Sequence, residues 1–312
     1  TNQNVVVAIK ANEKIQAVEG WTLSEDKMTL TKTYAENTAT NGENITVKDL
    51  AGNVATINVK ISNIDNTLPV AKVAYSTTEA TNKDVLVTIN TNKPVQTIEG
   101  WTLSENKLTL TKTYTNNTST EGENVIIKDL VGNSTTVNVK ITNIDKIAPT
   151  TNVAYSITEL TNQNVVVAIK ANEKIQAVDG WTLSEDKLTL SKTYTNNTQA
   201  EGENIVIKDL VGNTTTVNVK VTNIDKIAPT TNVAYSITEL TNQNVVVAIK
   251  ANEKIQTVEG WTLSEDKLTL TKTYKENTLA EGENVIIKDL AGNVVTVNVK
   301  ITNIDKIAPT TN

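Results

Sequence analysis

Carboxylate side chains recur at fixed positions along this sequence, and they are the groups best suited to chemistry. Asp145 is followed by Glu173, Asp186 and Asp209, and the same four acids return 80 residues later. Ca²⁺ takes about 6–8 oxygen ligands, so acids that converge from a chain end, a loop and two turns are suited to hold it. The candidate ligands are Asp145, Glu173, Asp186, Asp209, Asp225, Glu253, Asp266 and Asp289. The default interpretation is that they are solvated acids of ordinary turns.

The same positions differ in an earlier copy of the pattern. Lys93 stands where the other copies have a glutamate, and Asn106 replaces an aspartate. In addition, Asp145 is followed by Lys146, and the sequence contains no Asp-x-Asp string of the kind that often ligates calcium. If these acids form calcium sites, the site between the first and second copies is expected to be the weakest.

The side chains most used in catalysis are absent, since the chain has no histidine and no cysteine. This excludes imidazole acid–base chemistry, thiolate chemistry and zinc sites built from these residues. We therefore expect no enzymatic activity. The net charge is −6 and lysine does not cluster, which argues against a nucleic-acid partner. The longest apolar runs, such as residues 5–9, are far shorter than the roughly 20 residues of a membrane-spanning helix.

A repeat of 80 residues organises the whole chain. The segment that starts at Thr1 returns almost letter for letter at Thr161 and Thr241, and more loosely at Thr81. This period is too long for helical solenoids and suits one small β-domain, so each repeat should have its own core. The expected domains are residues 1–65, 66–145, 146–225 and 226–305, with a further linker beginning at 306–312.

Val, Ile and Thr alternate with polar residues between turns, which predicts strands rather than helices. The twelve glycines fall at three places per repeat, and four of the five prolines lie at repeat boundaries. We expect seven strands per repeat. In the third repeat they are predicted at 153–156, 165–170, 174–178, 181–183, 188–194, 204–208 and 215–224.

The odd number of strands determines how consecutive repeats connect. The chain reverses at each short connection, so it should enter and leave a repeat at opposite ends. The linkers contain Pro149 and Pro229 and no Gly/Ser tract, which restricts their flexibility. We therefore expect four β-sandwiches arranged end to end as a rod.

The first repeat has no counterpart of residues 153–158, which contain the predicted first strand at 153–156. A sandwich without that strand exposes a pairing edge. One interpretation is that the sequence is an excerpt of a longer array. The other is that a neighbouring chain supplies the strand, as in fibres assembled by strand complementation. Because residues 306–312 stop before the strand they would have to donate, the excerpt is favoured.

A turn and a linker carry a family resemblance. The turn reads Lys-Asp-Leu-Ala-Gly-Asn at 48–53 and recurs in every repeat, and in the later repeats a strand and the linker Asn-Ile-Asp-Lys-Ile-Ala-Pro follow it. This combination resembles the tandem immunoglobulin-like domains of large bacterial surface proteins and adhesins, particularly those of Gram-positive bacteria. The resemblance covers the whole chain. It implies seven-stranded immunoglobulin-like β-sandwiches, extracellular display and a stalk or adhesive role. Some relatives bind calcium between domains.

Two recurring features have structural explanations as well as functional ones. Asp49, Gly52 and Asn53 are expected to close a tight turn through side-chain-to-backbone hydrogen bonds, rather than to form a metal loop. The aromatic residues are too few to build both a core and a carbohydrate-stacking face, so the one tryptophan per repeat is expected in the core. These residues are Trp21, Trp101, Trp181 and Trp261.

The leading functional hypothesis is a non-enzymatic stalk or fibre shaft of a bacterial surface protein, since reach grows with the number of near-identical repeats. A multivalent binder of a host or glycan ligand is the first alternative. A filament whose repeats contact other copies is the second. The expected partners are the neighbouring repeats and other copies of the chain, and the expected location is the cell surface or a secreted fibre.

Overall fold

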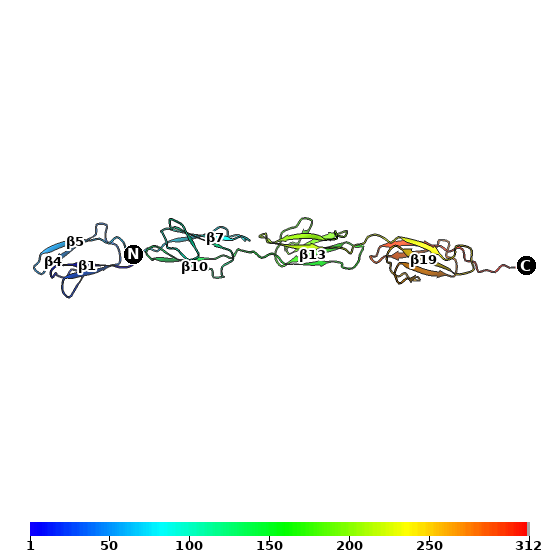
Figure 1. Cartoon of the computed structure of the whole chain (residues 1–312), viewed down its shortest axis with the longest axis horizontal. Coiled ribbons are helices and arrows are strands. Elements are labelled where there is room, and N and C mark those ends of the chain that lie inside the picture. Colours follow the sequence, from blue (N-terminus) through cyan, green and yellow to red (C-terminus); the bar gives the residue numbers. More distant parts are fainter. Residues whose placement is uncertain (311–312) are drawn as a thin grey trace. The chain divides into compact units, whose positions relative to one another are not determined.

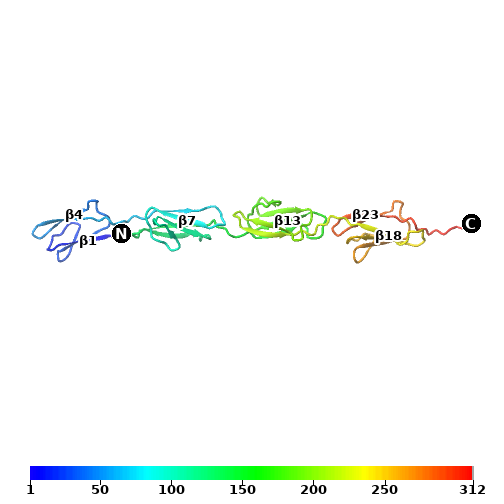
Figure 2. The same cartoon turned by 45° about the horizontal axis from the view of Figure 1, so that its top comes forward.

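The computed structural model describes residues 1–310, which form β-strands and no helix (Figures 1 and 2). Accordingly, no helix in this part of the chain has the length and apolar character needed to cross a membrane. The last two residues of the expected linker at 306–312 lie outside the described residues. The chain divides into two compact units, Thr1–Lys146 and Ile147–Asn312.

The strands follow the same sequence of lengths in the second, third and fourth repeats. The strands of the first unit are β1 (Val5–Lys10), β2 (Thr22–Leu23), β3 (Thr29–Tyr34), β4 (Glu43–Lys48), β5 (Val54–Val59), β6 (Ala71–Tyr75), β7 (Val85–Thr91), β8 (Thr102–Leu103), β9 (Thr109–Tyr114), β10 (Glu123–Lys128) and β11 (Ser134–Val139). Those of the second unit are β12 (Thr151–Tyr155), β13 (Val165–Ala171), β14 (Thr182–Leu183), β15 (Thr189–Tyr194), β16 (Glu203–Lys208), β17 (Thr214–Val219), β18 (Thr231–Tyr235), β19 (Val245–Ala251), β20 (Thr262–Leu263), β21 (Thr269–Tyr274), β22 (Glu283–Lys288) and β23 (Val294–Val299).

A larger and a smaller antiparallel sheet make up each repeat. In the third repeat the larger sheet has the order β12-β13-β15-β14, and β16 pairs with β17 to form the smaller one. The second and fourth repeats have the same strand orders. The first repeat has a three-stranded larger sheet of order β1-β3-β2, and a groove of about 400 Å³ lies beside β1.

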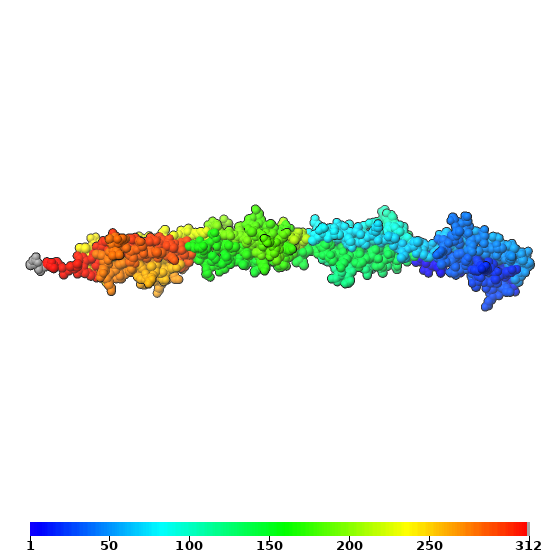
Figure 3. Space-filling view, turned by 180° about the vertical axis from the view of Figure 1, so that it is seen from behind, coloured from blue at the N-terminus to red at the C-terminus, as the bar shows by residue number. Residues whose placement is uncertain are grey.

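Period-two burial explains why these segments are strands. In β13, Val165, Val167 and Ile169 are fully buried, whereas Val166 between them is 40 % exposed. β-Branched side chains suit this pleated, half-buried surface. On the face drawn in Figure 3, side chains close over the strands of each repeat.

Buried apolar residues form a separate cluster in each repeat, and no cluster contains buried residues of two repeats. In the third repeat, Ile169, Leu190 and Ile207 are fully buried at its centre. Burying one such side chain stabilises a fold by about 1.5–3 kcal/mol. Trp181 packs against Tyr194 edge to face, with ring centroids 6.4 Å apart. Each repeat therefore has its own core.

The expected third strand of each repeat, at 174–178, is not a strand, so the prediction of seven strands is wrong. Repeats two to four have six strands each, and the first repeat has five. In the third repeat only Ile175 forms a bridge, to Asp209, and the Gln176 N–H donates to the Lys208 carbonyl at 2.8 Å. The chain then turns at Gly180 and joins the other sheet as β14. The segment 174–178 crosses the repeat without a continuous series of backbone hydrogen bonds to a neighbouring strand, because it leaves one sheet for the other.

The two ends of a repeat are marked by different backbone contacts. Where the chain enters the third repeat, Thr150 and Asn172 exchange hydrogen bonds of 2.8 and 3.1 Å. Where it leaves, Ile224 forms a parallel bridge with Thr161, which precedes the start of β13. Asn172 follows the end of that same strand. The chain therefore enters and leaves this repeat at opposite ends of β13, because its six strands and the segment 174–178 together cross the repeat seven times.

One lysine per repeat adopts a backbone conformation that favours glycine. Lys187 has φ of 60° in the turn before β15, and Lys27, Lys107 and Lys267 have φ of 59–60°. A left-handed conformation costs an L-residue about 1–2 kcal/mol, so glycine at this position is expected to stabilise each repeat by about 1 kcal/mol. With all four lysines replaced by glycine, the thermal unfolding midpoint should rise by about 4–8 °C.

A matched control places glycine where the backbone is extended. Lys208→Gly, at the end of β16, should lower the midpoint of the third repeat. If the four-glycine variant also melts at a lower temperature than the natural chain, the left-handed lysines are not strained.

Candidate junction site and a repeated charged cluster

Asp209 organises the turn between β16 and β17. Asp209 is buried, with 1 % of the residue exposed. The Oδ1 atom accepts hydrogen bonds from the N–H groups of Val211 (2.9 Å), Gly212 (2.6 Å) and Asn213 (2.8 Å), while Oδ2 accepts one from Asn213 Nδ2 (2.7 Å). Gly212 has φ of 99°, which this turn requires. The aspartate therefore closes the turn through its own side chain.

The equivalent turn in the first repeat has the same construction. Asn53 donates from its backbone N–H to Asp49 Oδ1 at 2.8 Å and from its side chain to Asp49 Oδ2. Gly52 has φ of 96°. Local hydrogen bonding thus explains the residues of the turn motif.

Three acids meet where the fourth repeat follows the third. Asp225 ends the third repeat, Glu253 follows β19, and Asp289 lies in the turn after β22. One carboxylate oxygen of each lies within 4.8 Å of the others. Asp289 is 1 % exposed and the other two are half-buried. Burial, followed by the charges of Asp225 and Asp289, raises the pKa of Glu253.

These carboxylates fit a hard cation by their chemistry, because oxygen donors are what Ca²⁺ prefers. Asp225, Glu253 and Asp289 would hold it. Asp289 would contribute oxygens that already accept hydrogen bonds from Gly292 and Asn293, so the turn itself would orient this ligand.

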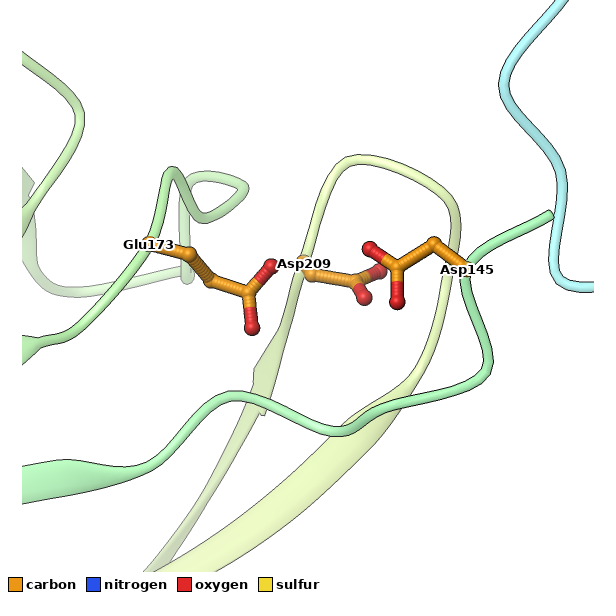
Figure 4. A group of neighbouring side chains, drawn as sticks. All are labelled: Asp145, Glu173 and Asp209. Carbon is orange, nitrogen blue, oxygen red and sulfur yellow. The ribbon is translucent and has the colours of Figure 1, made fainter. Parts of the chain in front are cut away.

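The corresponding acids of the third repeat show the same local arrangement. Figure 4 shows the side chain of Glu173 reaching toward Asp209, and one carboxylate oxygen of each lies within 4.8 Å of the other. Asp145 is the last but one residue of the first unit, where its N–H donates to the Thr81 carbonyl at 2.8 Å.

Asp186 and Asp266 do not belong to these clusters, so their prediction as ligands is not supported by their placement. Asp186 lies in the turn before β15, where it accepts hydrogen bonds from the Ser184 hydroxyl and the Leu188 N–H. Asp266 makes the same contacts with Ser264 and Leu268. The Ser184 hydrogen bond holds the pKa of Asp186 below its usual range. These acids are occupied by their own turns.

A lysine takes the place of the glutamate where the second repeat follows the first. Lys93 Nζ lies 2.9 Å from Asp65 Oδ2 and 3.1 Å from Asp129 Oδ2. Asp65 and Asp129 are the counterparts of Asp225 and Asp289. The sequence predicted the weakest calcium site here, and the structure places a positive charge between these acids.

A backbone contact accompanies the side-chain cluster at both places. Asn133 Nδ2 donates to the Asp65 carbonyl at 2.8 Å, and Asn293 Nδ2 donates to the Asp225 carbonyl at 2.9 Å. The turn asparagine thus tethers one repeat to the end of the preceding one. Pro149 and Pro229, at the starts of the third and fourth repeats, are buried.

A second recurring cluster was not predicted. Lys192 Nζ donates to both carboxylate oxygens of Glu203 (2.8 and 3.0 Å), and the Tyr194 hydroxyl donates to Glu203 Oε2 at 2.7 Å. The lysine also lies over the rings of Trp181 (5.7 Å) and Tyr194 (4.9 Å). Burial, followed by the hydrogen bond to Glu203, raises the pKa of Tyr194. The tryptophans Trp21, Trp101 and Trp181 are buried, and Trp261 packs against the core of its repeat.

The cluster fastens the ends of two strands. It joins β15 to β16 across the loop between them, and the equivalent residues make the same contacts in the other repeats. The signal available in the sequence was that a lysine, a tyrosine two residues later and a glutamate nine residues after that are unchanged in all four repeats.

Removing the tyrosine hydroxyl tests the cluster. With Tyr34, Tyr114, Tyr194 and Tyr274 all changed to phenylalanine, each repeat is expected to lose about 1.5 kcal/mol of stability, because a hydrogen bond to a carboxylate is lost while the ring packing remains. Urea unfolding would measure the loss. The matched control is Tyr75, Tyr155 and Tyr235 to phenylalanine, where the hydroxyl of Tyr155 accepts only a 3.4 Å contact from Lys220. Equal losses in the two variants would contradict the special role of the cluster.

No protein-family model and no curated protein matches the chain. Among solved structures, the chain is similar to one described as "tetra-tandem repeat in extending region of large adhesion protein". The match has 14 % sequence identity and a TM-score of 0.27, and it covers 98 % of this chain and 92 % of the other.

Proposed function

We propose that the chain is a non-enzymatic stalk region of a bacterial surface protein, made of immunoglobulin-like repeats that extend the protein away from the cell. The observation that carries this proposal is that the chain enters and leaves the third repeat at opposite ends of β13. Repeats connected in this way add length with each copy. A separate core in each repeat lets copies be added without disturbing their neighbours.

The junction contacts support a stiff stalk. Proline-containing linkers and the asparagine tethers at Asn133 and Asn293 restrict rotation of one repeat against the next. Calcium held by Asp225, Glu253 and Asp289 would neutralise their mutual repulsion and stiffen the junction further. The proposed location of the protein is extracellular, where the calcium concentration is high enough to fill weak binding sites.

Small-angle X-ray scattering of the 312-residue chain tests the stalk. Four repeats of about 35–45 Å each, estimated from strand rise and loops, give a rod whose radius of gyration is about 40 Å or more. A compact chain of this length has a radius of about 20 Å. A value near 20 Å would refute the stalk.

A lateral binding role is the second candidate, and one observation favours it. An apolar side chain points outward at the same position of the smaller sheet in three repeats, with Ile126 and Ile286 each 56 % exposed and Val206 48 % exposed. Such a row could contact other copies or a ligand repeatedly, with avidity from the linkage. Changing all three to threonine, as at Thr46 in the first repeat, should abolish concentration-dependent association in sedimentation experiments if this row is the contact.

A further inference from the structure

We propose that Lys93 acts as a tethered cation, which holds the first and second repeats together without any dissolved ion. Its ammonium group contacts four oxygens. Lys93 Nζ donates to Asp65 Oδ2 at 2.9 Å and Asp129 Oδ2 at 3.1 Å, and the carbonyl and hydroxyl oxygens of Thr67 accept from it at 2.7 and 2.9 Å. An ammonium group has three protons, so its hydrogen-bonding capacity is fully used.

The four oxygens come from both repeats and from the linker. Asp65 ends the first repeat, Thr67 lies in the linker, and Asp129 belongs to the turn after β10 in the second repeat. Lys93 itself follows β7 of the second repeat. A single side chain therefore connects the body of one repeat to the end of the other.

Burial separates this contact from an ordinary surface ion pair. The Lys93 side chain is 20 % exposed and that of Asp129 is 3 % exposed. Asp129 is also held in place by hydrogen bonds from Val131, Gly132 and Asn133. Solvent and salt weaken the attraction between a lysine and a fixed, sheltered carboxylate less than they weaken the attraction within an exposed ion pair.

The junction between the third and fourth repeats isolates the effect of the lysine. Asp225 and Asp289 occupy the same positions as Asp65 and Asp129, and the asparagine tether is present at both junctions. The side-chain charges at the first junction sum to −1 (two aspartates and Lys93), and those at the other sum to −3 (two aspartates and Glu253). Like charges within 4.8 Å repel one another. With lysine at this position, the side chain itself neutralises part of the negative charge. With glutamate, the junction needs a positive charge from outside the chain.

Pulsed electron–electron distance measurements on the full chain test the proposal. The chain has no cysteine, so Thr56→Cys and Thr136→Cys, at exposed and equivalent positions of β5 and β11, place one spin label in each of the first two repeats. In a buffer with EDTA, the natural lysine should give a narrow distance distribution. Lys93→Met should widen it about twofold, because the lost positive charge leaves the two aspartates repelling one another.

Two further variants keep the result interpretable. Asp65→Ala removes the partner in the first repeat and leaves the second repeat intact, so it should widen the distribution as Lys93→Met does. Lys72→Met changes an exposed lysine of β6 and should leave the width unchanged. An unchanged width in both Lys93→Met and Asp65→Ala would overturn the proposal, as would equal widening by Lys72→Met.

This inference does not depend on the stalk function. A compact scattering profile would refute the stalk and leave the effect of Lys93 on the first junction standing. An unchanged distance distribution would refute the tethered cation and leave an extended profile standing.

Discussion

Replacing Asp209 with alanine is expected to lower the free energy of unfolding of the third repeat by about 3 kcal/mol, since a buried acceptor shared by several donors is lost. Three backbone N–H groups and one side-chain amide donate to this carboxylate, which is 1 % exposed. Alanine cannot replace any of these bonds, and the turn after β16 loses the group that shapes it. Water can reach the half-buried parts of the turn, which keeps the cost below the sum of four separate losses.

Calorimetry of the four-repeat chain would measure this effect. About 3 kcal/mol in a domain of this size corresponds to a fall of roughly 12–24 °C in the unfolding midpoint. Because each repeat has its own core, one transition of about a quarter of the heat should separate from the rest. Asp186→Ala is the matched control, because that aspartate is exposed and caps only its own turn. A variant that melts in a single unshifted transition would show that Asp209 does not hold the turn.

The strands of the two sheets were predictable because burial alternates along them. Residues 165–170 and 204–208 match β13 and β16 to within one residue at each end. The segment 174–178 has a similar composition, but it forms a single bridge, because it leaves one sheet to join the other as β14. Local alternation reports which side chains face the core. It does not report whether a second strand runs alongside for long enough to form a ladder.

The candidate site was predictable only in part. The acids at Asp225, Glu253 and Asp289 meet because the ends of antiparallel strands are brought to one end of a repeat, which the order of reversals gives. Asp266 comes from the same end, but Ser264 and the Leu268 N–H hold it in its own turn. The pairing of Lys192 with Glu203 could not be predicted from position, since it depends on how the loop between β15 and β16 closes.

Replacing Glu253 with lysine should give the junction between the third and fourth repeats the same contacts as the junction between the first and second. The new ammonium group would lie between Asp225 and Asp289, as Lys93 lies between Asp65 and Asp129. The apparent affinity of this junction for Ca²⁺ should fall at least about tenfold, because a ligand is lost and a positive charge takes the place of the ion. Spin labels at Thr216→Cys and Thr296→Cys, the equivalents of the labels above, would report the width of the distance distribution.

The natural chain and the variant should respond to calcium in opposite ways. With Glu253, the distribution should be broad in EDTA and narrow when Ca²⁺ is added. With lysine, the distribution should be narrower than that of the natural chain in EDTA, and Ca²⁺ should not change it. Glu259→Lys makes the same change of charge at an exposed position of the same repeat and should keep the calcium response. A variant at Glu253 that still narrows only with Ca²⁺ would show that the three acids are not the calcium ligands.

The linker limits how complete the conversion can be. Thr67 supplies both a carbonyl and a hydroxyl oxygen to Lys93, whereas its counterpart Ile227 has no hydroxyl. The Glu253→Lys ammonium would therefore have at most three of the four oxygens. Adding Ile227→Thr restores the fourth, and Ile227 is exposed, so its replacement disturbs no core. The double variant should then give a distribution as narrow as that of the first junction, while the single variant gives one of intermediate width. If the threonine makes no difference, the two carboxylates and the linker carbonyl are enough to hold the lysine, and the Thr67 hydroxyl adds nothing to the contacts of Lys93.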